Sequence, residues 1–109
     1  MSTQWIHVCE TTDIDQEDVL GFEHNGKPYC VYHTADGFFA TDGMCTHEDE
    51  LLEYGMVIDH VIECPLHQGR FDVRTGEALS APVCVKLQTW PVKVDNGSVF
   101  VDLTDVPGT

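Results

Sequence analysis

Two short segments of this 109-residue chain each place one thiol close to one imidazole. The first segment reads Cys45-Thr46-His47 and the second reads Cys64-Pro65-Leu66-His67. A zinc finger usually groups cysteine with cysteine and histidine with histidine, because one turn or one helix face delivers each pair. A mixed pair on each segment instead lets both segments reach both irons of a two-iron cluster. The four side chains therefore predict a [2Fe–2S] centre, with a zinc-binding module as the alternative.

The two segments resemble the Rieske family, whose pattern is Cys-x-His, a spacer of comparable length, and Cys-Pro-x-His followed by a glycine. In this sequence the match is Cys64-Pro65-Leu66-His67-Gln68-Gly69, so the glycine comes after one intervening residue. The resemblance implies that the cofactor is one [2Fe–2S] cluster, whose first iron is held by Cys45 and Cys64 and whose second iron is held by His47 and His67. It also implies that the imidazole edges lie near the surface, where an electron would enter and leave.

The positions around the ligands indicate the reduction potential. In the high-potential Rieske proteins of respiratory complexes, each loop carries an extra cysteine, and a serine and a tyrosine donate hydrogen bonds to sulfur. The matching positions here are Glu50, Leu66, Gly69 and Phe71, so none of these four features is present. Without the hydroxyl donors, the charge of an added electron is less stabilised. We therefore expect a potential in the lower half of the Rieske range of roughly −150 to +300 mV.

Charge and composition restrict the partners. The chain has 19 acidic and 5 basic residues, a formal net charge of −14, which would repel nucleic acid and anionic membranes. A protein with a basic docking surface would be attracted instead, although the acidity could equally serve solubility alone. No apolar run approaches the roughly 20 residues that a membrane helix needs. The N-terminal residues lack the pattern of a secretory signal, so we expect a cytoplasmic protein.

The pattern of short β-rich runs between Gly, Asn and Asp residues predicts an all-β fold. Turns are expected at Asn25-Gly26, Asp36-Gly37 and Asp95-Asn96-Gly97. The expected strands cover residues 5–9, 19–24, 29–33, 38–40, 87–94 and 98–103, and a small hairpin pairs 56–58 with 61–63. We expect one domain, 1–109, built as a Rieske-type antiparallel β-sandwich with an inserted cluster-binding subdomain at about 43–69. A later Ala81-Pro82 resembles the family's loop that shields the cluster.

Other residues with reactive side chains have structural explanations. Cys9, Cys30 and Cys84 lie in apolar runs and are expected to be buried thiols. Arg70 and Arg74 are expected to pair with acidic residues. The remaining histidines, which have no partner at metal-ligand spacing, are expected on the surface or in strands: His7, His24, His33 and His60.

The function that the resemblance implies is single-electron transport. The stretches Gly69-Arg70-Phe71-Asp72 and Arg74-Thr75-Gly76 are similar to those of Rieske ferredoxins in bacterial aromatic-ring dioxygenase systems. Such a ferredoxin receives electrons from a flavin-dependent reductase and passes them to a Rieske non-haem iron oxygenase, and it is not itself an enzyme. We expect a monomer. The alternative is a small Rieske-like subunit of a nitrite reductase, in which one or more of the four ligands is often missing.

Overall fold

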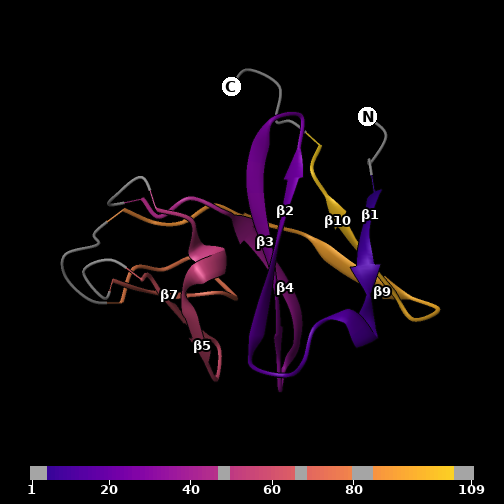
Figure 1. Cartoon of the computed structure of the whole chain (residues 1–109), viewed down its shortest axis with the longest axis horizontal. Helices are drawn as coiled ribbons and strands as arrows, with labels where there is room; N and C mark the ends of the chain where they lie inside the picture. Colours follow the sequence, from indigo (N-terminus) through magenta and orange to yellow (C-terminus); the bar gives the residue numbers. More distant parts are fainter. Residues whose placement is uncertain (1–4, 47–49, 66–68, 80–84, 105–109) are drawn as a thin grey trace.

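The computed structural model describes residues 5–46, 50–65, 69–79 and 85–104. Within them the chain forms three antiparallel sheets and two short 3-10 helices, which confirms the all-β prediction. In Figure 1 the sheet of β2, β3 and β4 stands in the middle, with β5 and β7 on one side and β1, β9 and β10 on the other. Among the described residues, none of the helices has the length and hydrophobicity that crossing a bilayer requires.

The first sheet contains the first and the last described strand of the chain, β1 and β10, together with β9. It has the order β1-β10-β9, with bounds β1 Trp5–Glu10, β9 Val92–Asp95 and β10 Ser98–Asp102. The turn between β9 and β10 has φ angles of 53° at Asn96 and 81° at Gly97, as the sequence predicts for a tight hairpin. The 3-10 helix η1 (Thr11–Asp13) follows β1 and leads to the second sheet.

The central sheet has the order β2-β3-β4-β8, with bounds β2 Asp18–His24, β3 Lys27–Thr34, β4 Gly37–Asp42 and β8 Thr89–Trp90. The predicted Asn25-Gly26 turn is confirmed, with φ angles of 54° and 80°. Strand β3 is buried on both faces, because Tyr29 and Val31 pack into one core and Cys30 and Tyr32 pack into another. Its uninterrupted apolar sequence is typical of a strand covered on both sides.

The third sheet has the order β5-β6-β7 and follows η2 (Leu52–Tyr54), with bounds β5 Met56–Ile58, β6 Val61–Glu63 and β7 Arg70–Asp72. The predicted hairpin of 56–58 with 61–63 is confirmed, and β7 is an addition to it. Val57, Ile62 and Phe71 form one row across the sheet, and all three are buried against the Cys30 and Tyr32 side of β3. This core positions the two segments with cysteine and histidine.

Candidate metal centre

The two predicted cysteine ligands that the structure describes lie in the same core. Cys45 is 4% exposed and Cys64 is 1% exposed, and both pack in the group that contains Leu52, Ile62 and Phe71. Two thiolates in such apolar surroundings would carry uncompensated negative charge, whereas coordination to iron neutralises them. The donor chemistry and the depth of this pair therefore fit a [2Fe–2S] cluster held by thiolates on one side.

The two loops that begin at these cysteines are closed in the same way. The backbone N–H of Cys45 donates a hydrogen bond to the carbonyl of Glu50 at 2.9 Å, and that of Cys64 donates to the carbonyl of Gly69 at 2.7 Å. In each case the acceptor is the fifth residue after the cysteine, so each loop returns to its own starting point. His47 and His67 belong to these loops but lie outside the described residues, as does Ala81-Pro82. Of the four predicted ligands, the structure thus brings together Cys45 and Cys64.

The start of the first loop, which we call the Asp42 anchor, is fixed to β8 and β3. The Asp42 backbone N–H donates to the Gln88 carbonyl at 2.9 Å, and the Gly43 N–H donates to the Pro28 carbonyl at 3.0 Å. A side chain at Gly43 would place its Cβ 2.8 Å from the Pro28 backbone, so only glycine allows this approach. The Asp42 carboxylate accepts a hydrogen bond from the Trp90 indole at 2.9 Å. Nothing in the local sequence indicates this contact.

A second set of hydrogen bonds joins the loops to the segment that follows β7. The Thr46 hydroxyl donates to the Val85 carbonyl at 2.9 Å. Further along, the Leu87 N–H donates to the Gly76 carbonyl at 2.7 Å, and the Leu79 N–H donates to the Arg70 carbonyl at 2.8 Å. Residues on both sides of 80–84 are therefore held in place, with Val85 bonded to the start of the first loop and Leu79 bonded to β7.

Ion pairs neutralise several of the acidic residues near the loops. Arg70 Nε lies 3.3 Å from Glu63 Oε1, and Lys27 Nζ lies 3.6 Å from Asp42 Oδ1. Arg74 binds Asp72 at 3.0 Å, so the structural pairing predicted for Arg70 and Arg74 is confirmed. Partial burial opposes ionisation of Asp72, but the hydrogen bonds and the charge of Arg74 outweigh it and hold the pKa of Asp72 below its ordinary value.

The two thiols outside the loops that the structure describes, those of Cys9 and Cys30, are buried. Cys9 and Cys30 are buried free cysteines, as predicted, and Cys84 lies outside the described residues. Burial is the main reason that the pKa of the Cys30 thiol rises to about 12, so this thiol stays protonated. Beside it, the fully buried Tyr32 hydroxyl makes a 2.8 Å hydrogen bond with the Thr41 hydroxyl.

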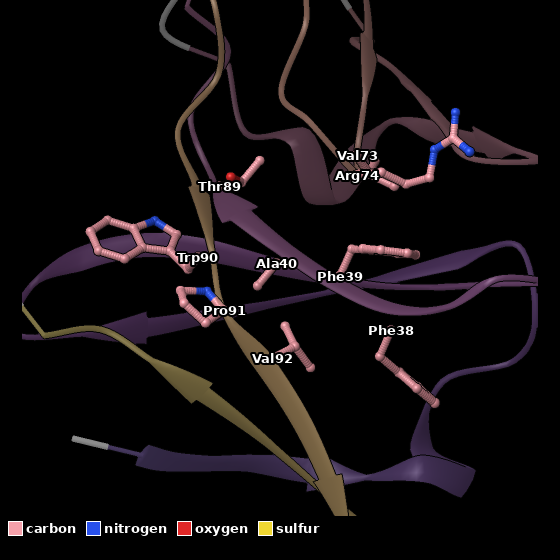
Figure 2. A pocket seen from close by; sticks show the side chains of 9 residues that line it. All are labelled: Phe38, Phe39, Ala40, Val73, Arg74, Thr89, Trp90, Pro91 and Val92. Carbon is pink, nitrogen blue, oxygen red and sulfur yellow. The ribbon is translucent and has the colours of Figure 1, made fainter. Parts of the chain in front are cut away.

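A separate hollow of about 460 Å³ opens between β4 and the segment of β8 and β9. Figure 2 shows Phe38 and Phe39 on β4, Trp90 on β8 and Val92 on β9 around it, with the Arg74 side chain extending away from them. Neither Cys45 nor Cys64 lines this hollow. Among the described residues, this hollow is therefore separate from the two cysteine ligands.

Comparison with known proteins agrees with this geometry. Residues 4–91 match the model of the Rieske [2Fe-2S] domain. The ferredoxin component of the naphthalene 1,2-dioxygenase system of Pseudomonas putida is 44% identical over 104 residues, which cover 95% of this chain and 100% of the relative. The ferredoxin component of biphenyl 2,3-dioxygenase from Rhodococcus jostii is 41% identical, with 88% of this chain and 90% of the relative covered.

Two solved structures share this fold at different levels of sequence identity. A structure described as a complex of reduced oxygenase and oxidized ferredoxin in carbazole 1,9a-dioxygenase has a chain that superposes with a TM-score of 0.86 at 37% identity, covering 90% of this chain and 92% of that chain. A putative nitrite reductase small subunit from Mycobacterium tuberculosis has a TM-score of 0.84 at 18% identity, covering 97% of this chain and 100% of that chain. The second likeness shows a shared fold alone.

Proposed function

We propose that this chain, which belongs to the Rieske [2Fe–2S] family and is a ferredoxin, passes electrons one at a time to a terminal oxygenase. The oxygenase would be that of an aromatic-ring dioxygenase system. The observation that carries the proposal is the pair of identically closed loops that bury Cys45 and Cys64 in one core. The electrons would come from a flavin-dependent reductase. The chain itself performs no chemistry on the organic substrate, since it is the electron carrier of the system.

The ligands in this proposal are Cys45 and Cys64 on one iron and His47 and His67 on the other. The cluster supplies reversible storage of one electron. The chain's own residues bury the thiolate side and hold the loops: the carbonyls of Glu50 and Gly69 close them, and the Asp42 anchor attaches the first loop to the central sheet. A cluster-binding subdomain at about 43–69 within a single domain is part of this proposal, as are a monomeric state and a cytoplasmic location.

Charge supports a partner with a basic docking surface. With a net charge of −14, the chain attracts such a partner over long range, and salt screens that attraction. The nitrite reductase alternative is less supported, because the relatives described above at 44% and 41% identity are ferredoxin components of dioxygenases.

Electron transfer provides the functional test. The purified, cluster-loaded protein is mixed with the reductase and oxygenase components of the Pseudomonas putida naphthalene 1,2-dioxygenase system, and product formation is followed. We expect turnover that depends on this protein and slows as salt rises. Absence of turnover, while the cognate ferredoxin supports it under the same conditions, would reject the proposed function.

Ligand identity has its own test with matched controls. Cys45→Ser and His47→Ala are each expected to lose the iron, the acid-labile sulfide and the visible absorption of the cluster. Cys9→Ser and His24→Ala, which make the same changes elsewhere in the chain, are expected to retain them. A loaded protein that holds zinc and no sulfide would support the zinc-binding alternative instead.

A further inference from the structure

One face of the β5-β6-β7 sheet is open to solvent although it carries apolar side chains. The register gives two outward rows on this sheet. The first is Met56, Glu63 and Arg70, and the second is Ile58 and Val61, followed by Asp72, which is itself buried and paired with Arg74. Met56 is 61% exposed and Ile58 is 52% exposed, whereas Val57 between them is buried. Tyr54, at the end of η2, adds a third large exposed side chain at 68%. We call this surface the outer face.

The outer face is hollowed and reaches the second loop of the metal centre. A hollow of about 310 Å³ is lined by residues of both outward rows and of the β5-β6 turn: Met56, Ile58, Asp59, Val61, Glu63 and Arg70. A neighbouring hollow of about 220 Å³ is lined by residues of the outer face and of the second loop: Tyr54, Gly55, Met56, Glu63, Cys64 and Pro65. A partner seated here would therefore also touch the loop that begins at Cys64.

The charges around the outer face are acidic. Asp59 is exposed at the β5-β6 turn, and Glu17 lies beside it, since the Glu17 carboxylate accepts a 2.9 Å hydrogen bond from the Asp59 backbone N–H. The cation that lines the hollow, Arg70, is already paired with Glu63. The matching surface on a partner would present an apolar side chain with Lys or Arg beside it.

We propose that the outer face is the docking surface for the terminal oxygenase, which fills the hollow beside Met56 and Ile58 with an apolar side chain flanked by basic residues. This proposal rests on the proposed function and adds to it the surface used for recognition. The open apolar residues supply short-range contact, and the acidic rim supplies complementary charge. Continuity with Cys64 and Pro65 places the docked partner next to the cluster loop.

The test uses single substitutions that change the charge equally at two distant places. Met56→Glu and Ile58→Glu each add one negative charge to the outer face. Val94→Glu adds the same charge at a side chain of similar exposure, 49%, on β9. Figure 1 shows β5 and β9 on opposite sides of the molecule. Met56→Gln, a variant without added charge, measures the loss of apolar contact alone.

With the naphthalene 1,2-dioxygenase oxygenase as the probe, we expect Met56→Glu and Ile58→Glu to raise the KM for reduced ferredoxin by about tenfold. Met56→Gln should raise it by a smaller factor, and Val94→Glu should change it by less than about twofold. The rate of reduction by the reductase and the reduction potential should match those of the wild-type protein for all four variants.

Equal KM values for Met56→Glu and Val94→Glu, with normal turnover by the wild-type protein, would overturn the docking proposal and leave the proposed function intact. Slower reduction of the outer-face variants by the reductase, with an unchanged KM for the oxygenase, would also overturn it, because the outer face would then bind the electron donor. If the wild-type protein supports no turnover at all, the proposed function fails and this proposal fails with it.

Discussion

The indole N–H of Trp90 donates a hydrogen bond to the carboxylate of Asp42 across 48 positions of sequence, at 2.9 Å. This bond connects β8 with the residue that leads into the first loop of the metal centre. Lys27 contacts the same carboxylate at 3.6 Å and lies 6.0 Å from the centre of the Trp90 ring. The Asp42 anchor is thus held from two strands that are distant in sequence.

Replacing Trp90 by phenylalanine removes the donor and keeps an aromatic ring in place. We expect the free energy of unfolding to fall by about 1 kcal/mol, because the partly buried Asp42 carboxylate loses a hydrogen bond. Urea unfolding of the cluster-loaded protein measures the change. Trp5→Phe on β1 makes the same chemical change away from the Asp42 anchor. Equal losses in the two variants would show that the Asp42 contact contributes nothing specific.

Arg74→Met is expected to destabilise the protein at neutral pH, and by more than Arg70→Met does, because it leaves the buried carboxylate of Asp72 without its cation. In the folded wild-type protein the pKa of Asp72 is held below its ordinary value. The stabilisation by the ion pair is therefore complete above the unfolded-state pKa near 4, and it is lost as the pH falls from there through the lower folded-state pKa. The difference in unfolding free energy between wild type and variant should therefore become smaller below about pH 4. Unfolding free energies measured across pH check this.

Arg70→Met provides the comparison for that series. Arg70 is 54% exposed and its partner Glu63 is 23% exposed, so this pair is more solvated than Arg74 with Asp72. We expect its loss to cost less than about 1 kcal/mol. A larger effect at Arg70 than at Arg74 would contradict the role assigned to burial.

Gly76 and Gly97 have the same φ of 81° but different surroundings. A Cβ at Gly76 would lie 1.9 Å from the Leu87 carbonyl oxygen, whereas a Cβ at Gly97 would have no heavy atom within 4 Å. Gly97→Ala should cost about 1 kcal/mol, for the left-handed backbone alone. Gly76→Ala should cost at least about 3 kcal/mol, because overpacking is added to that strain. Thermal unfolding of both variants decides whether the close approach to Leu87 matters.

Phe71→Tyr tests why the reduction potential should be low. Phe71 is fully buried in the core that contains Cys45 and Cys64, at the position where high-potential relatives carry a tyrosine. A hydroxyl that donates to sulfur contributes about 1 kcal/mol, which corresponds to roughly 40 mV for one electron. We expect a rise of about that size by voltammetry. Phe100→Tyr on β10 should leave the potential unchanged, and a fall in the Phe71 variant would contradict the hydrogen-bond account.

Local signals in the sequence predict the hairpins well. Asn25-Gly26 and Asn96-Gly97 adopt the positive φ angles that these residue pairs favour, so both turns form where expected. The single strand expected at 87–94 is wrong. The structure has two shorter strands there, β8 at 89–90 and β9 at 92–95, which are separated by Pro91, a residue that has no N–H to donate to a sheet. The sequence pattern does not predict strand β7, because its three residues become extended through pairing with β6.

The candidate site shows the same division between local and distant contacts. The types and spacing of Cys45, Cys64 and their neighbours predict a metal centre, since coordination chemistry restricts the ligands. The bonds that close the loops at Glu50 and Gly69 use backbone atoms, which carry no residue-specific signal. The contact of Trp90 with Asp42 depends on how the central sheet is assembled, and sequence patterns do not report it.

Four of the five cationic residues contact an acid or an aromatic ring of this same chain: Lys27, Arg70, Arg74 and Lys93. The charges of Lys27, Arg70 and Arg74 are thus offset by neighbouring carboxylates, and the net charge of −14 dominates the field at long range. Such a field increases how often a basic partner arrives without selecting the side on which it arrives. The rate at which a partner meets this protein and the orientation in which it docks are therefore separate properties, and different residues can control them.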